Sequence, residues 1–165
     1  MIMVADASPL IFLGKIGQLG LIPMLFPGKP WVPASVREEL VIPPISPAEE
    51  AALLEFLKSC QIVAVTKSTR FAAALSKADN EVLTLAIRRK ADFIFTDDRL
   101  LRQLALVEGI RPMGTLGILL RSLEQGLLTK SKTRQWIETL VQQHQFRISI
   151  EVYDATLQRI EDTRQ

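Results

Sequence analysis

The sequence FIFTDDRL, residues 93–100, places two adjacent carboxylates, Asp97 and Asp98, directly after a short apolar run that ends at Thr96. A short apolar run bounded by polar residues is typical of a strand buried in a parallel sheet. In open parallel sheets, ligands bind beyond the carboxyl ends of the strands. The stretch therefore predicts a buried strand over 91–96 that presents acidic side chains at the ligand-binding edge of a sheet.

Short apolar runs alternate with helical patterns along the rest of the chain. We expect further strands over 2–5, 31–32, 62–65 and 110–113. Helices are expected from the Ser8–Pro9 pair, from capping patterns at Ser35 with Glu38, at Ser46 with Glu49 and at Ser76 with Asp79, and over 99–109, 117–125, 132–143 and 152–160. This alternation predicts an α/β fold with a mainly parallel sheet of four to five strands.

Composition restricts the chemistry that the chain can support. The 165 residues fit one domain, and 48% apolar residues are enough for a sizeable core. Cys60 is the only cysteine and His144 the only histidine, which excludes an internal disulfide and a zinc site built from these residue types. Asp6 and Lys15 interrupt the apolar N-terminal stretch before it reaches the roughly 18 residues of a membrane span. We expect a cytoplasmic protein without a membrane segment.

Acidic residues recur at positions that the predicted fold brings to one edge of the sheet. Asp6 follows the first predicted strand, and Asp97 and Asp98 follow the strand at 91–96, so these carboxylates meet if the two strands are neighbours. Glu39 and Asp79 lie in the first turns of helices that enter from the same edge. Each acid taken alone also suits a structural role, because acids cap helices and favour their first turns.

Four converging carboxylates need an additional source of stabilisation. Their mutual repulsion is usually offset by a divalent cation, and oxygen ligands without His or Cys favour Mg²⁺ or Mn²⁺. Such ions lower the pKa of a bound water and stabilise the leaving oxygen of a phosphate ester. The acidic residues therefore predict a nuclease or a phosphatase.

Five stretches resemble the PIN-domain family, and within it the VapC-like ribonuclease toxins that carry a C-terminal helical extension. They are VADASPLI, VPASVREEL, LSKADNEVLTLA, ADFIFTDDRLL and GTLGILLRSLEQGLL, and together they span nearly the whole chain. The resemblance implies a PIN-like three-layer α/β/α nuclease domain over residues 1–114. It also implies a C-terminal helical extension over 115–165 that packs on the same domain.

The resemblance also implies the residues of the site. Asp6, Glu39, Asp79 and Asp97 match the acids with which the family hydrolyses RNA, and the expected ligands of Mg²⁺ or Mn²⁺ are Asp6, Asp79, Asp97 and Asp98. The ion would position a water for in-line attack on phosphorus and neutralise charge on the phosphate.

Three of these positions have a neighbouring alternative. The distance from the preceding acid selects Asp97, whereas the family's common Thr-x-Asp form selects Asp98. The alternatives for the second and third acids are Glu38 and Glu81.

The predicted function is a metal-dependent endoribonuclease that acts as the toxin of a toxin–antitoxin pair. Its implied partners are RNA, a protein antitoxin and a second copy of the chain in a homodimer. The main alternative is a catalytically silent PIN-like module that binds RNA or protein. A phospho-acceptor receiver domain ranks third, because it requires an acid pair after the first strand and Asp6 is followed by Ala7.

Several side chains near the acids in sequence are candidates for contacting RNA. The basic candidates for the RNA backbone are Arg37, Lys77, Arg99 and Arg102, which equally suit ordinary helix surfaces. Phe12 suits core packing better than base stacking.

Overall fold

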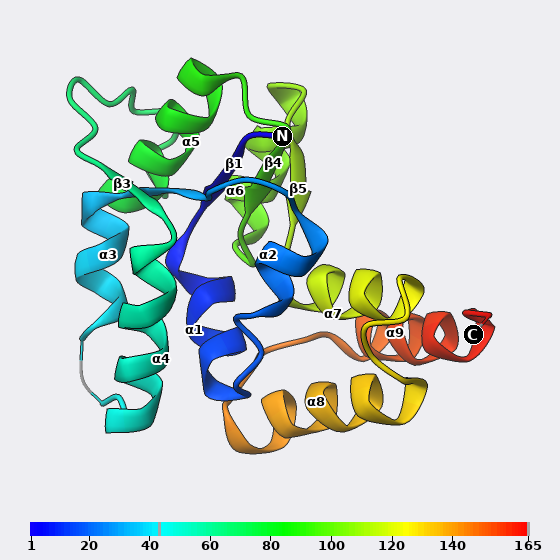
Figure 1. Ribbon diagram of the computed structural model, residues 1–165. Coiled ribbons are helices and arrows are strands. Elements are labelled where there is room, and N and C mark those ends of the chain that lie inside the picture. The colour runs from blue at the N-terminus through cyan, green and yellow to red at the C-terminus, as the bar shows by residue number, and fades with distance from the viewer. Residues whose placement is uncertain (43, 165) are drawn as a thin grey trace.

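The computed structural model describes residues 1–42 and 44–164 of the chain (Figure 1). Within this part, one all-parallel sheet has the strand order β3-β2-β1-β4-β5. Its strands are β1 (Met3–Ala5), β2 (Trp31–Pro33), β3 (Gln61–Val63), β4 (Phe93–Phe95) and β5 (Arg111–Met113). Each strand overlaps an expected one, so the predicted α/β fold with a parallel sheet is confirmed.

Helices connect the strands and continue beyond the last one. The described residues form α1 (Ala7–Lys15), α2 (Leu21–Leu25), α3 (Ala34–Leu40), α4 (Pro47–Lys58), α5 (Lys77–Arg89), α6 (Arg99–Val107), α7 (Thr115–Glu124), α8 (Lys130–Gln143) and α9 (Ile150–Asp162). The sequence did not predict α2, which is only five residues long. Helices α7, α8 and α9 each begin two residues before the expected position. The last two begin earlier because Thr129 and Ser149 cap them, with side chains that accept from backbone amides of the first turn.

Two predicted helix starts are wrong. The N-cap of α1 is Asp6 rather than Ser8, because Asp6 Oδ1 accepts the adjacent backbone amide at 2.7 Å. Helix α3 follows a proline and has no side-chain cap. The hydroxyl of Ser35 donates instead to Glu81 Oε2 at 2.6 Å, so the expected capping box with Glu38 does not form. A long-range hydrogen bond has replaced a local one.

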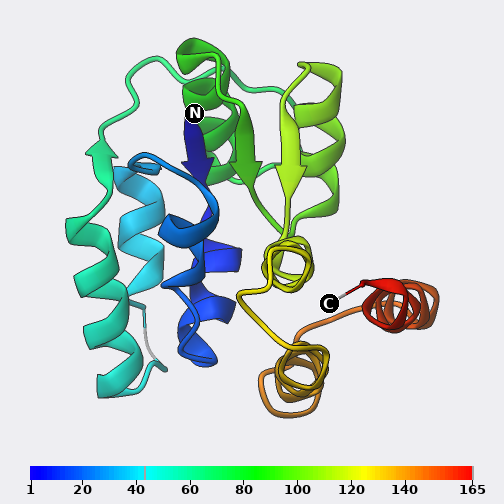
Figure 2. The same cartoon turned by 45° about the vertical axis from the view of Figure 1, so that its right-hand side comes forward.

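Helices cover both faces of the sheet. On one side, α5 packs against β1, β2 and β4, and α6 packs against β5; Figure 2 shows these two helices behind the strands. On the other side, the ring of Phe26, which follows α2, contacts the rings of Phe93 and Phe95 at centroid distances of 5.2 and 4.9 Å. These two β4 residues share a face because side chains alternate along a strand. The sheet is thus buried between helical layers.

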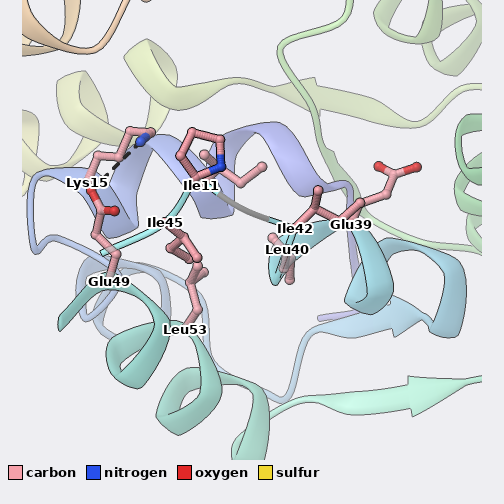
Figure 3. Close-up of a pocket in the computed structure, with 9 residues that line it drawn as sticks. Ile11, Lys15, Glu39, Leu40, Ile42, Ile45, Glu49 and Leu53 are labelled. Atoms are coloured by element: carbon pink, nitrogen blue, oxygen red, sulfur yellow. Dashed lines mark ion pairs between the residues drawn. The ribbon is translucent and has the colours of Figure 1, made fainter. Parts of the chain in front are cut away.

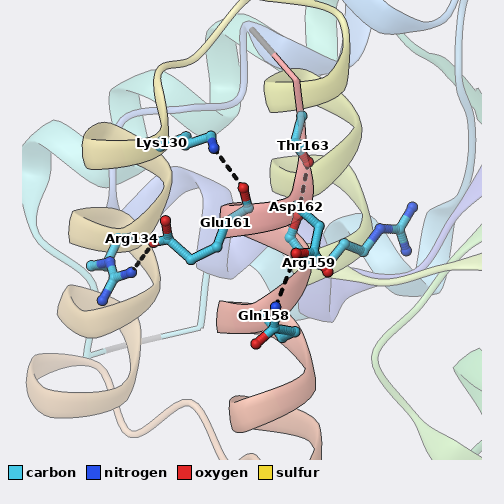
Figure 4. A network of polar contacts seen from close by, with 7 residues as sticks. All are labelled: Lys130, Arg134, Gln158, Arg159, Glu161, Asp162 and Thr163. Atoms are coloured by element: carbon cyan, nitrogen blue, oxygen red, sulfur yellow. Dashed lines mark hydrogen bonds and ion pairs between the residues drawn. The ribbon is translucent and has the colours of Figure 1, made fainter.

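The last three helices form one packed unit. Helix α7 contacts α1, α2 and β5, and both α8 and α9 pack on α7 and on each other. Ile137, Leu140 and Ile160 are fully buried there. Exposed polar contacts add to this packing: Arg134 pairs with Glu161, whose backbone carbonyl accepts from Lys130 Nζ at 2.6 Å (Figure 4). Exposed ion pairs contribute little, so burial of apolar side chains holds the unit together.

No helix in residues 1–42 or 44–164 has both the length and the hydropathy that crossing a membrane requires.

Replacing Phe26 with alanine tests the packing against β4. Phe26 is fully buried, and truncation leaves a cavity beside two aromatic rings. We expect Phe26→Ala to lower the free energy of unfolding by about 3–5 kcal/mol. Met24→Ala, which lies in α2 two residues before Phe26 and is 63% exposed, should change it by less than about 0.5 kcal/mol. Urea unfolding followed by circular dichroism measures both, and similar losses for the two variants would contradict the assignment.

Candidate active site

The ends of β1 and β4 lie side by side, which brings the acids that follow them together. Met3, Val4 and Ala5 are in register with Phe93, Ile94 and Phe95. The pairing continues past the strands, because the Asp6 amide donates to the Phe95 carbonyl at 2.9 Å. Asp6 and the Asp97–Asp98 pair therefore follow adjacent strands at the same edge of the sheet, as predicted.

One open cleft at this edge receives all the predicted acids. It has a volume of about 590 Å³, and its lining includes Asp6, Glu39, Asp79, Asp97 and Asp98. They come from the ends of β1 and β4, from α3 and from the first turn of α5. The expected position of Glu39 in the first turn of its helix is wrong, because Glu39 lies in the last turn of α3. Residues separated by up to 92 positions in the sequence thus meet in one acidic cleft.

Asp6 is the most deeply placed of these acids, with 6% of its surface exposed. Its Oδ1 accepts from the Ala7 amide at 2.7 Å, and its Oδ2 accepts from the hydroxyls of Thr96 and Ser8 at 2.9 and 3.2 Å. Burial raises the pKa of Asp6 to about 6, because desolvation outweighs these hydrogen bonds. The nearby charge of Asp79 raises this pKa further.

Asp79 and Glu39 face the same space. Asp79 forms the expected capping box, in which its Oδ2 accepts from the Ser76 amide at 2.9 Å and its own amide donates to the Ser76 hydroxyl at 3.0 Å. Burial raises the pKa of Glu39, and the charge of Asp79 raises it in addition. Asp79 therefore couples electrostatically to acids on two other elements.

The two alternatives, Glu38 and Glu81, are absent from the lining of the cleft. Glu81 is 6% exposed and accepts from the Ser35 hydroxyl, with Lys77 Nζ at 3.8 Å from its other oxygen. The bond to Ser35 links α5 to α3, whereas the Lys77 contact lies within α5. Geometry accordingly favours Asp79 over Glu81, and Glu39 over Glu38, as the acids of the cleft.

The two adjacent aspartates after β4 make different contacts. Asp97 Oδ1 accepts from the Thr115 amide at 2.7 Å, and its Oδ2 accepts from the Thr115 hydroxyl at 2.6 Å. Burial raises the pKa of Asp97, although Thr115 and the charge of Arg102 oppose the shift. Asp98 Oδ1 accepts from the Leu101 amide at 2.7 Å and so caps α6. Asp98 therefore has the structural role expected of an acid at a helix start, as the N-cap of α6.

The acids are not drawn together into a closed ligand set. Among the described residues, no group of three or more acidic, histidine or cysteine side chains is close enough to hold a metal ion as it stands. Both Asp97 oxygens point to the first residue of α7 instead. The donor chemistry still suits a hard divalent cation, because three of the acids have raised pKa values that a nearby positive charge would lower.

Sequence reasoning missed several residues of the cleft. A glycine before Thr115 indicates a helix start at this position. Nothing in the sequence, however, indicates that Thr115 contacts Asp97. Thr115 does not line the cleft itself but bonds Asp97, which does, whereas Gln145, Phe146 and Arg147 line the cleft from the connection between α8 and α9. Only the packing of the C-terminal helices brings them there.

A smaller cavity of about 80 Å³ adjoins the acidic cleft (Figure 3). It lies among α1, α3 and α4 and shares Ile11 and Glu39 with the cleft. Lys15 Nζ lies 3.7 Å from Glu49 Oε1 at its edge, and Glu49 also forms the expected capping box with Ser46. Glu39 therefore stands between an acidic space and a mainly apolar one.

The sheet and the acidic cleft at its edge define an α/β domain with the kind of carboxylate site that serves hydrolysis of phosphate esters. A family model described as PIN domain matches residues 2–162, and the chain therefore belongs to the PIN-domain family. PIN domains are typically nucleases that act on RNA and use divalent metal ions. A search of curated proteins returned no match.

Gly114 makes room for the Asp97 carboxylate. A Cβ atom at this position would lie 2.4 Å from Asp97 Oδ1 and 3.1 Å from Arg102 Nη1. We expect Gly114→Ala to displace Asp97 from Thr115 and to lower the free energy of unfolding by about 1–3 kcal/mol. Gly20→Ala is the control, because a Cβ there meets nothing within 4 Å. Chemical denaturation compares the two, and equal stabilities would contradict the contact.

Titration of Asp6 should make the stability of the metal-free protein fall with rising pH. Its pKa is about 6 in the native state against 3.8 without the fold, so the native state binds the proton more tightly. Stability is therefore highest below about pH 4 as far as this group is concerned, and is lost as pH rises through 6. The difference corresponds to roughly 3 kcal/mol.

The Asp6→Asn variant lacks this titration. In the presence of chelator, the free energy of unfolding of Asp6→Asn should rise relative to that of the wild type as the pH increases from 4 to 7. Asp154→Asn, on the exposed surface of α9, should run parallel to the wild type. A constant difference between Asp6→Asn and wild type across this range would refute the shifted pKa.

Proposed function

We propose that this PIN domain is a metal-dependent endoribonuclease that hydrolyses RNA phosphodiester bonds, and that it acts as the toxin of a toxin–antitoxin pair. One observation carries the nuclease proposal: acids from four separate places in the chain line one cleft at the carboxyl edge of the sheet. Bringing these acids together is unfavourable for folding, because burial and repulsion from Asp79 raise the pKa values of Asp6 and Glu39.

The proposed ligands of Mg²⁺ or Mn²⁺ are Asp6, Asp79 and Asp97, with Asp98 beside them. When bound, the ion lowers the pKa of a water molecule and neutralises charge on the scissile phosphate. The hydroxyls of Thr96 and Ser8 hold the Asp6 carboxylate in a fixed orientation. Glu39 is exposed at the cleft and has a raised pKa, so it is placed to accept a proton from the attacking water.

The toxin role, the antitoxin and the homodimer rest on the resemblance to VapC-like toxins. The balanced charge and the mean hydropathy of +0.20 are compatible with an apolar interface. Leu106 and Val107, at the end of α6, are 62% and 80% exposed and supply apolar surface for such a partner. We further propose that the protein acts in the cytoplasm, where its RNA substrates are found.

A catalytically silent module remains the competing hypothesis, and one observation favours it. Both oxygens of Asp97 are occupied by Thr115, and the described acids do not form a ready metal site. A silent module would bind RNA or protein without cutting RNA, so a cleavage assay separates the two hypotheses.

Cleavage of structured RNA should require both the divalent ion and the acids. We expect the purified protein to cut such RNA with Mn²⁺ and to stop when chelator is added. Asp6→Asn and Asp79→Asn should each lower the rate at least about 100-fold, because each removes a ligand of the ion. Asp154→Asn, an exposed acid outside the cleft, should cut at the wild-type rate.

Cleavage that survives chelator, or equal rates for Asp6→Asn and wild type, would refute the metal mechanism. RNA binding without cleavage by the wild-type protein, with either Mg²⁺ or Mn²⁺, would establish the silent module.

A further inference from the structure

The connection between α8 and α9 forms one wall of the acidic cleft. Gln145, Phe146 and Arg147 line the cleft together with Asp6 and Asp97, although they follow these acids by at least 48 residues. Figure 1 shows this orange segment leaving the end of α8 near α1 and running beneath α7 to α9. The C-terminal helices therefore contribute residues to the site itself.

Local backbone geometry and one aromatic contact fix this segment in place. Gln145 has a φ of 54°, in the left-handed region, which turns the chain out of α8. The Phe146 amide then donates to the Leu140 carbonyl at 3.0 Å. The Phe146 ring, 8% exposed, packs edge-on against Phe12 of α1 at a centroid distance of 4.8 Å. Since Asp6 is the N-cap of α1, this contact connects the segment to the helix that Asp6 caps.

The residue after Phe146 is Arg147, which lines the cleft and whose positive charge is unpaired in the described part of the chain. Arg147 is exposed and makes no ion pair or hydrogen bond with any residue in the described part of the chain. It is also absent from the charges that shift the pKa values of Asp6, Glu39 and Asp97. The guanidinium therefore lies at the rim of the cleft rather than among its carboxylates.

The other basic residues considered for RNA binding are placed differently. Arg102 Nη1 donates to the Thr96 carbonyl at 3.2 Å, and Lys77 lies 3.8 Å from Glu81. Arg37 and Arg99 are absent from the lining of the cleft. Of the basic side chains in the described residues, Arg147 is the one that lines it.

An acidic cleft repels the polyanion that it is proposed to cut. Favourable approach of RNA requires a cation that contacts a phosphate next to the scissile bond without neutralising the acids. Arg147 meets both conditions, since it is unpaired and lies at the rim. Its planar guanidinium can donate two parallel hydrogen bonds to one phosphate.

We propose that Arg147 binds a backbone phosphate of the RNA substrate and positions the chain across the acidic cleft. Arg147 is thus a positioning residue, and the connection between α8 and α9 is part of the substrate-binding surface. The inference rests on the proposed function for the identity of the polyanion, while the placement of Arg147 at the cleft is independent of whether cleavage occurs.

Binding of labelled single-stranded RNA, measured by fluorescence anisotropy in chelator, tests this contact without cleavage. We expect Arg147→Gln to weaken binding about tenfold. The slope of log Kd against log salt should fall by about 0.7, the value for one phosphate contact to a single strand. Arg147→Lys should keep most of the slope, because it keeps the charge. Arg164→Gln, an exposed arginine outside the cleft, should match wild type.

Cleavage kinetics with Mn²⁺ give a second readout. A positioning role predicts that Arg147→Gln raises KM about tenfold and changes kcat less than about threefold. Unchanged affinity and salt slope would overturn the proposal, as would absence of RNA binding by wild type. Faster cleavage by Arg147→Gln would overturn it in favour of an inhibitory contact. A fall in kcat at constant KM would overturn it in favour of a role in the chemical step.

Different results would refute the role of Arg147 in RNA binding and the proposed nuclease activity. Wild-type cleavage with an Arg147→Gln variant that binds and cuts normally would refute the role of Arg147 alone. RNA binding that depends on Arg147 without cleavage by wild type would support the role of Arg147 and refute the nuclease.

Discussion

The pairing of β1 with β4 is the constraint on which the site depends. It places the Asp6 amide against the Phe95 carbonyl and lets the buried Thr96 hydroxyl donate to Asp6 at 2.9 Å. The same hydroxyl accepts from the Asp98 amide at 3.1 Å, so one threonine orients the turns after both strands. Each strand has only three residues. The register of β4 against β1 is fixed by burial of Ile94 and Phe95, which are both fully buried in β4. A slip of one residue would carry the acids to the opposite face.

The cleft stores unfavourable electrostatic energy that the rest of the fold offsets. Desolvation and repulsion raise the pKa values of Asp6 and Glu39, whereas hydrogen bonds from the backbone and from hydroxyls lower that of Asp6. Helix N-termini also stabilise the charged carboxylates. Hydrogen bonds from backbone amides at or beside a helix start reach Asp6, Asp79 and Asp98. The structural and the functional interpretations of these acids are therefore compatible. Asp79 and Asp98 each use one carboxylate oxygen at a helix start and keep the other for a ligand.

The sequence predicted the architecture well because its strands are continuous apolar runs and most of its helices carry local caps. It predicted the acids for the same reason, since Asp6 and Asp97 directly follow such runs. It failed where a residue's partner lies far along the chain. Ser35 matched a local capping pattern, yet its hydroxyl bonds Glu81, 46 residues away. Arg147 reaches the cleft only through the turn at Gln145 and the contact of Phe146 with Phe12. No local pattern encodes such packing.

The C-terminal helices reach the acidic site at two separate places, which argues against treating them as an accessory. At one end, the first residue of α7 holds both oxygens of Asp97, and Gly114 leaves the space for that carboxylate. At the other end, Gln145, Phe146 and Arg147 of the connection between α8 and α9 line the cleft. Since α8 and α9 both pack on α7, a shift of this unit would move Arg147 together with Thr115, the residue that bonds Asp97. The position of one acid and the position of the rim cation are thus set by the same packed helices.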